Sequence, residues 1–155
     1  MAIDKAEWQY DTAKEGYCKK YNKNPDALTD EDVDIIWEIA GNHIAIFITW
    51  LTRHNLLGDL HHEFDLEEKD LDAVKKQEKT GMDIFSKYCD MSFTDEDICD
   101  EIAPFVEAYY DKDYLKDYCN CIGDEKVLET TFSWDDYFKV EPVLDQAYKN
   151  FMEGK

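Results

Sequence analysis

Glycine and proline are scarce in this chain, which has 6 glycines and 3 prolines among 155 residues. The glycines do not cluster into a phosphate-binding loop, and no G-x-S-x-G turn for a hydrolase nucleophile occurs. The five cysteines include no C-x-x-C pair, which argues against a zinc finger, and their odd number argues against a disulfide framework. We therefore expect no cofactor and no catalytic residue: a protein that is not an enzyme and that works in a reducing cytoplasm.

Basic residues and long apolar runs are also lacking. The chain has 17 lysines and arginines against 37 acids, a formal net charge of -20. A field of this sign repels nucleic acid and anionic membranes and steers basic proteins toward the surface. The longest strongly apolar stretch, residues 44–51, is far shorter than the roughly 20 residues of a transmembrane helix, and the N-terminus has acids where a signal peptide is apolar. The expected partner is therefore a basic protein, with no direct nucleic acid contact and no membrane.

Apolar and aromatic residues, by contrast, are plentiful, at 44% and 14% of the chain. That content is too high for a disordered acidic tail, and 155 residues suit one domain with its own core. Thr-Asp-Glu-Asp, a hydroxyl cap followed by acids, occurs at residues 29–32 and 94–97 and predicts two helix starts. Ser133 predicts another, with Pro142 splitting the last helix. We expect an all-α fold for residues 1–155: a single compact multi-helix domain in which a small β element is possible.

The most apolar segment is residues 43–51. As a helix it is apolar almost all round, which is typical of the buried centre of a domain. Every second residue from 44 to 48 is an isoleucine, so a buried strand is the alternative. We favour the helix because the residues that follow continue it. The expected structural core is His43, Phe47 and Trp50.

Acidic residues concentrate in one part of the chain, residues 90–125, which hold twelve acids and only two lysines. Three tyrosines recur there at every fourth position of an expected helix, with two aspartates beside them. Tyrosine is enriched in interface hot spots, and aspartate complements lysine and arginine. The predicted partner-binding residues are Tyr110, Asp113, Tyr114, Asp117 and Tyr118. The alternative is that the tyrosines belong to the core and the aspartates to a solvated face.

The histidines offer one weak candidate for metal chemistry. His61 and His62 stand among acids, but their spacing matches no zinc-protease motif and no helix-borne histidine pair. A stretch from Asp111 begins like a calcium loop but lacks the oxygen ligand and the glycine at its fifth and sixth positions. We therefore expect no metal site, and a metal-assisted enzyme using His61 and His62 is the weakest functional alternative.

Several short segments together resemble a family of small acidic bacterial proteins catalogued as a domain of unknown function. The segments are His43–Trp50 with Leu57–Gly58, Thr80–Gly81, Thr94–Asp97, Tyr109–Tyr114, Trp134–Tyr137 and Pro142–Val143. The resemblance covers most of the chain from about residue 38 and implies no catalytic residue.

Small size, acidity and a bacterial setting make that family similar to the immunity proteins of toxin systems. The similarity is an analogy in these general properties and rests on no shared motif. It leads us to expect an inhibitor that neutralises a basic toxin domain, for example a nuclease, encoded nearby. The alternative is a generic cytoplasmic interaction module whose acidity serves only solubility.

Overall fold

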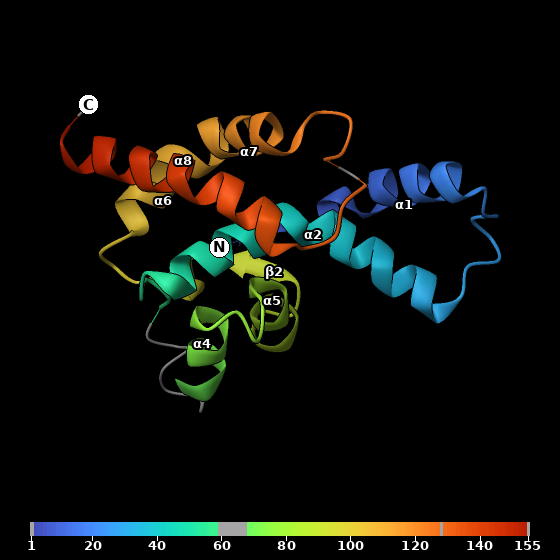
Figure 1. The fold of residues 1–155 in the computed structure, drawn as a ribbon, viewed down its shortest axis with the longest axis horizontal. Coiled ribbons are helices and arrows are strands. Elements are labelled where there is room, and N and C mark those ends of the chain that lie inside the picture. Colours follow the sequence, from blue (N-terminus) through green and yellow to red (C-terminus); the bar gives the residue numbers. More distant parts are fainter. Residues whose placement is uncertain (1, 59–67, 128, 155) are drawn as a thin grey trace.

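The computed structural model describes residues 2–58, 68–127 and 129–154. These form a mostly helical fold with a small two-stranded sheet, which confirms the expected fold class. The helices are α1 (Glu7–Tyr21), α2 (Asp30–Arg53), α4 (Glu68–Lys75), α5 (Gly81–Tyr88), α6 (Ala103–Tyr109), α7 (Leu115–Ile122) and α8 (Trp134–Met152). The strands are β1 (Ala2–Lys5) and β2 (Ser92–Thr94). Helix α2 runs through the middle of the molecule, with α7 and α8 on one side and α4 and α5 on the other (Figure 1).

Helix α2 begins where its sequence predicts. The Thr29 side chain accepts a hydrogen bond from the Asp32 amide at 3.1 Å, and the Asp32 carboxylate accepts one from the Thr29 amide at 3.0 Å. This reciprocal capping satisfies two backbone donors that have no partner within the helix. The helix continues unbroken through Gly41 and residues 44–51, so the strand alternative for that segment is wrong. Glycine at position 41 allows α2 to approach α5 closely, because a Cβ there would lie only 3.0 Å from the Phe85 ring.

The length and composition of α2 are also those of a helix that could cross a membrane. In this structure, 83% of its most apolar stretch is buried inside the protein. A buried central helix of a packed domain passes the same test, because its whole circumference is apolar.

The three residues expected in the core are buried there. Phe47 and Trp50 are fully buried, and His43 is 5% exposed. Phe47 is the centre of an aromatic cluster, in which its ring lies 5.1 Å from Tyr110 and 4.9 Å from Tyr114, both edge to face. The buried face of α2 therefore meets the acidic Tyr-rich segment directly.

The two-stranded sheet joins the N-terminus to the segment after α5. Strands β1 and β2 pair antiparallel, with a register irregularity between Ala2 and Asp4. This pairing holds Asp4 inside the protein, where its carboxylate accepts hydrogen bonds from His43 Nε2 at 2.9 Å and from the Tyr110 hydroxyl at 2.8 Å. Burial alone would raise the pKa of Asp4, but these hydrogen bonds and the attraction of His43 outweigh it and lower the pKa.

Two helix-boundary predictions are wrong. Thr94 does cap a turn, but the turn is only the 3-10 segment Asp95–Asp97, after which the backbone at Ile98 is extended. Helix α6 begins later, with Pro104 in its first turn, where proline's missing amide hydrogen costs nothing. Ser133 does cap α8 by accepting from the Asp136 amide, but Pro142 lies inside that helix and does not divide it.

Candidate partner-binding surface

The three tyrosines predicted as partner anchors lie in the core. Tyr110 is 3% exposed, and Tyr114 and Tyr118 are fully buried. Their four-residue spacing marks one stripe of a helix, and the structure turns that stripe toward Phe47 and the rest of α2. The partner-binding assignment of these tyrosines is therefore corrected, and the core alternative holds.

Each buried hydroxyl of the three has a hydrogen-bond partner. Tyr110 donates to Asp4, Tyr114 donates to the backbone carbonyl of His43 at 2.5 Å, and Tyr118 accepts from the Asn42 side chain at 2.9 Å. Burial raises the pKa of all three phenols, so they remain protonated at neutral pH. These side chains connect the acidic segment to α2 and β1, and they are unavailable to a partner.

A turn of π-helix at Tyr110–Tyr114 explains why so many aromatic residues face inward here. The segment runs continuously from α6 through this turn into α7. The π turn contains one residue more than an α turn, so the inward face shifts by one position. In α6 the buried residues are Phe105, Val106 and Tyr109, and from the turn to the end of α7 they are Tyr110, Tyr114, Tyr118 and Ile122.

The two predicted aspartates stay at the surface. Asp113 is exposed, and the half-buried Asp117 accepts a hydrogen bond from the Tyr109 hydroxyl at 2.6 Å. Burial raises the pKa of Tyr109, and its bond to Asp117 and the nearby carboxylate charge raise it further. Tyr109 thus remains a neutral donor that orients the Asp117 carboxylate.

Asp113 and Asp117 line a groove of about 370 Å³ between the α6–α7 segment and α8, which we call the α8 groove. Its other lining residues are Phe105, Ala108, Tyr109, Lys116, Ala147, Asn150 and Phe151. Its floor is aromatic, because the ring of Phe105 stacks on Tyr109 at 5.0 Å and lies 5.6 Å from Phe151. The groove therefore places carboxylates beside apolar surface.

Phe151 lines this groove, although its spacing in the sequence predicts a core residue on the inward face of the last helix. It continues the inward stripe of α8, but it lies in the last turn, where the helix extends past the core, and its side chain is 37% exposed. Periodicity identifies the stripe but cannot show where the core beneath it ends. The exposed ring is an apolar group of the kind that serves as an interface anchor.

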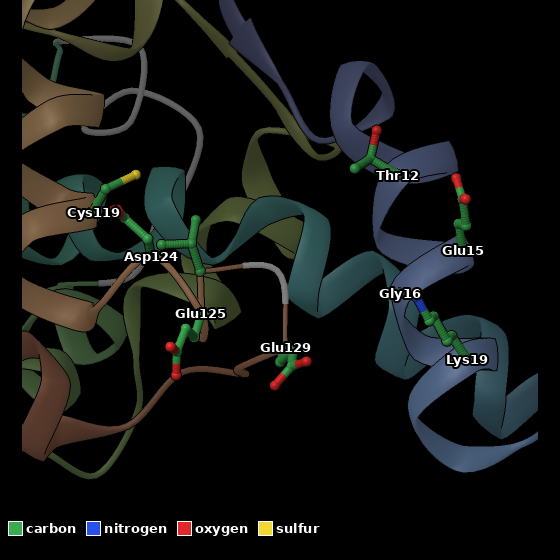
Figure 2. Close-up of a pocket in the computed structure, with 9 residues that line it drawn as sticks. Thr12, Glu15, Gly16, Lys19, Cys119, Asp124, Glu125 and Glu129 are labelled. Atoms are coloured by element: carbon green, nitrogen blue, oxygen red, sulfur yellow. The ribbon is translucent and has the colours of Figure 1, made fainter.

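A second hollow, of about 510 Å³, lies between α1 and residues 119–129 (Figure 2). Glu15 and Lys19 of α1 line one side of it, and Asp124, Glu125 and Glu129 line the other. Part of its negative charge is compensated within the chain, because its lining contains a lysine and the neighbouring Lys20 approaches Glu129 at 3.6 Å. Each of the two sites has one lysine in its lining, so charge does not distinguish them. Among the described residues that line this hollow there is no aromatic ring, whereas the α8 groove has the exposed ring of Phe151, so the α8 groove is the better candidate for a partner-binding surface.

His61 and His62, the histidines of the weakest functional alternative, lie outside the described residues. Within the described residues, no group of three or more histidine, cysteine, aspartate or glutamate side chains is arranged to hold a metal ion. All five cysteines are free thiols in the structure.

A family model described as a domain of unknown function (DUF7832) matches residues 2–133. The match includes residues 2–37, which the sequence resemblance left out, and stops before the Trp134–Tyr137 and Pro142–Val143 segments. No curated protein and no solved structure matches the chain.

Proposed function

The chain belongs to this family of unknown function, and we propose that it is an inhibitor that binds a basic protein through the α8 groove. The proposal extends to the immunity type of inhibitor, which neutralises a basic toxin domain such as a nuclease. On this account the protein acts in the cytoplasm by binding alone, with no catalytic step, cofactor or membrane contact of its own.

One observation carries the proposal. The exposed carboxylate of Asp113 and the oriented carboxylate of Asp117 line the same groove as the half-exposed ring of Phe151. Productive protein interfaces combine an apolar anchor that leaves water with charged groups around it. The groove offers both, and the sign of its charge selects a partner rich in lysine and arginine.

The charge of the whole chain supports the same class of partner. A net charge of -20 speeds encounter with a basic protein and opposes binding to nucleic acid. A nuclease is a fitting example, because its own substrate surface must attract phosphates. Carboxylates placed over that surface would both bind it and block its substrate.

A pull-down tests the proposal, with the product of the neighbouring gene as the first candidate and salt raised in a second experiment. We expect capture at low salt, weaker capture at high salt, and loss of the partner's activity upon binding. The test variant combines Asp113→Asn with Asp117→Asn and keeps the acceptor for Tyr109. The control variant combines Asp72→Asn with Glu78→Gln. These substitutions remove the same amount of negative charge from two exposed acids that are remote in sequence from the groove.

The two variants decide between a site and a general charge effect. The proposal predicts that the α8 groove variant loses affinity by about tenfold, because each rim charge contributes up to about 1 kcal/mol. It also predicts that the control variant binds nearly as the wild type does. Equal losses of affinity in both variants would show that the acidic residues act only through their total charge, and would refute the α8 groove as the binding site.

A further inference from the structure

A third groove lies on the other side of α2, between that helix and the segment from α5 to β2. Its volume is about 510 Å³. Its rim carries the carboxylates of Asp34 and Glu38 from α2 and of Asp83 and Asp90 from the α5 side. We call it the α2–α5 groove. Helix α5 lies on the opposite side of α2 from α7 and α8 (Figure 1), so the α2–α5 groove is separate from the α8 groove.

The negative charge of this rim has no counterpart in the groove. Among the described residues that line it, there is no lysine, arginine or histidine. Burial raises the pKa of Glu38, and repulsion from Asp34 and Asp83 raises it further. Asp83 is partly engaged, because it caps α5 by accepting from the Thr80 amide at 2.8 Å. The rim thus holds like charges together at a cost that an incoming cation would relieve.

The floor of the groove is apolar and held in place. Trp37 is half-buried, and its ring packs against Tyr10 with the ring centres 4.5 Å apart. Met82 beside it is buried, and Met91 completes the floor. A fixed tryptophan face attracts a cation as well as an apolar chain, and methionine adapts to the shape of what it contacts.

This combination fits one kind of ligand group. Arginine and lysine have an apolar stem and a cationic head, so the stem can cover Trp37 while the head reaches the carboxylates. A bare metal ion would need convergent ligands, and the described acids form no such group. We propose that the α2–α5 groove binds an arginine- or lysine-bearing segment of a protein partner. That the same protein binds both the α8 groove and the α2–α5 groove rests on the proposed function. The preference of the α2–α5 groove for cationic side chains does not.

A peptide titration of the intact protein tests this inference without a known partner. The probes are hexa-arginine and, as the opposite charge, hexa-glutamate, both at low salt. Binding is followed by the NMR shift of the Trp37 indole proton, which Trp37→Phe assigns. We expect hexa-arginine to shift this signal and hexa-glutamate to leave it unchanged.

Two variants of equal net charge locate the peptide. The groove variant carries Asp34→Asn, Glu38→Gln and Asp90→Asn and spares the capping residue Asp83; asparagine suits position 90, where φ is +51°. The control variant carries Asp72→Asn, Glu78→Gln and Glu107→Gln, all exposed and outside the groove. We expect the groove variant to bind hexa-arginine about tenfold more weakly and the control variant less than twofold more weakly.

Three results would overturn the inference. The first is an unchanged Trp37 signal with hexa-arginine, and the second is an equal loss of hexa-arginine affinity in the two variants. The third is equally tight binding of spermine or Mg²⁺ at Trp37, which would show that the groove binds any cation. If hexa-arginine binds here but no basic protein is captured through the α8 groove, the proposed function fails while this inference stands. If a basic protein is captured but Trp37 does not respond, the reverse holds.

Discussion

A tyrosine hydroxyl inside a protein needs a hydrogen-bond partner, and here the partners of Tyr110, Tyr114 and Tyr118 come from two elements, β1 and α2. Tyr110 reaches β1, Tyr114 reaches the backbone of α2, and Tyr118 receives the amide of Asn42. These bonds make the acidic segment part of the core on its inner side. The outer side, with Asp113, is the only side of that helix available to a partner.

Replacing Tyr110 with phenylalanine separates a core role from an interface role. The Asp4 carboxylate would lose one of its donors while buried, so the free energy of unfolding should fall by about 1–3 kcal/mol. Affinity for a basic partner should not change. Chemical denaturation and a binding titration on the same sample measure both. Tyr21→Phe, at a tyrosine that is 52% exposed, is the control and should leave stability unchanged. Weaker binding by Tyr110→Phe at unchanged stability would return this residue to the interface.

Trp50 is the second test at the residue scale. Its ring is fully buried, and its indole nitrogen donates to Asp145 of α8 at 2.9 Å. Trp50→Ala should lower the free energy of unfolding by about 3–5 kcal/mol, because it empties a large aromatic site. Trp8→Ala, at a tryptophan that is 58% exposed, should change it by less than about 1 kcal/mol. Similar losses in the two variants would contradict the central place given to α2.

At the scale of helices, α2 and α5 touch at a glycine. The Gly81 amide donates to the Thr49 hydroxyl at 2.9 Å, and a Cβ on Gly81 would lie 2.1 Å from that oxygen and 2.2 Å from the Ala45 carbonyl. The overlap with the Ala45 carbonyl cannot be relieved without moving one helix, because that oxygen belongs to the backbone. The close contact therefore fixes the position of α5, and with it one wall of the α2–α5 groove.

Gly81→Ala should accordingly destabilise the protein, although alanine is the better helix former. We expect a loss of about 1–3 kcal/mol, the usual cost of forcing atoms into a packed site, measured by thermal or chemical unfolding. Ser86→Ala, on the exposed face of the same helix, is the control and should be neutral or slightly stabilising. A stabilised Gly81→Ala protein would show that the two helices are not in such close contact.

The helices differ in how much of them could be predicted from sequence. Thr29 and Ser133 are local signals, because the cap and the amide that it accepts from lie within three residues, and both were predicted correctly. Thr94 carries the same signal, but the chain after it turns to pair Leu57 with Ile98, a contact between distant segments. Local chemistry therefore indicates that a turn begins without indicating how long it continues.

The candidate site was harder to predict than the fold. Spacing placed Tyr110, Tyr114 and Tyr118 on one stripe, but a stripe has the same spacing whether it faces solvent or the core. Its direction depends on the π turn at 110–114 and on Phe47, which no local pattern encodes. The sequence predicts Asp113 and Asp117 as partner-binding residues from their charge and their position beside the tyrosines, but the groove that they line comes from the packing of α8, which the sequence does not indicate.

At the scale of the whole molecule, a few carboxylates are tightly held among many that are only solvated. Asp32 is 5% exposed and accepts from the Tyr17 hydroxyl at 2.6 Å and from Lys23 at 2.9 Å. The hydrogen bonds from Tyr17, from Lys23 and from the Thr29 backbone hold the pKa of Asp32 well below its usual range. A carboxyl whose pKa is lower in the folded state stabilises the fold above its unfolded pKa and loses that effect as the pH falls toward the folded value.

The pH dependence of Asp32→Asn follows from that sign. The wild type should be more stable than the variant at pH 7, and the difference should shrink as the pH falls below about 4, the ordinary pKa of aspartate. Denaturant midpoints of both proteins from neutral to acidic pH measure it, and the comparison cancels the self-repulsion that both share. A difference that stayed constant down to the lowest pH would show that the variant acts through packing alone.

The net charge of -20 and the apolar surface of the α8 groove have different roles in binding a basic partner. We infer that the charge speeds the encounter and that apolar contact in the groove slows dissociation. The most direct measurement is the association rate of a captured partner as salt rises from about 0.01 to about 0.15 M, over which the Debye length falls from about 30 to about 8 Å. We expect the association rate to fall steeply with salt for the wild type and less steeply for the variant that combines Asp113→Asn with Asp117→Asn. For Phe151→Ala we expect faster dissociation from the partner and an unchanged dependence of the association rate on salt. If the association rate of the wild type does not depend on salt, encounter with the partner is not electrostatic and the acidity of the chain does not serve binding.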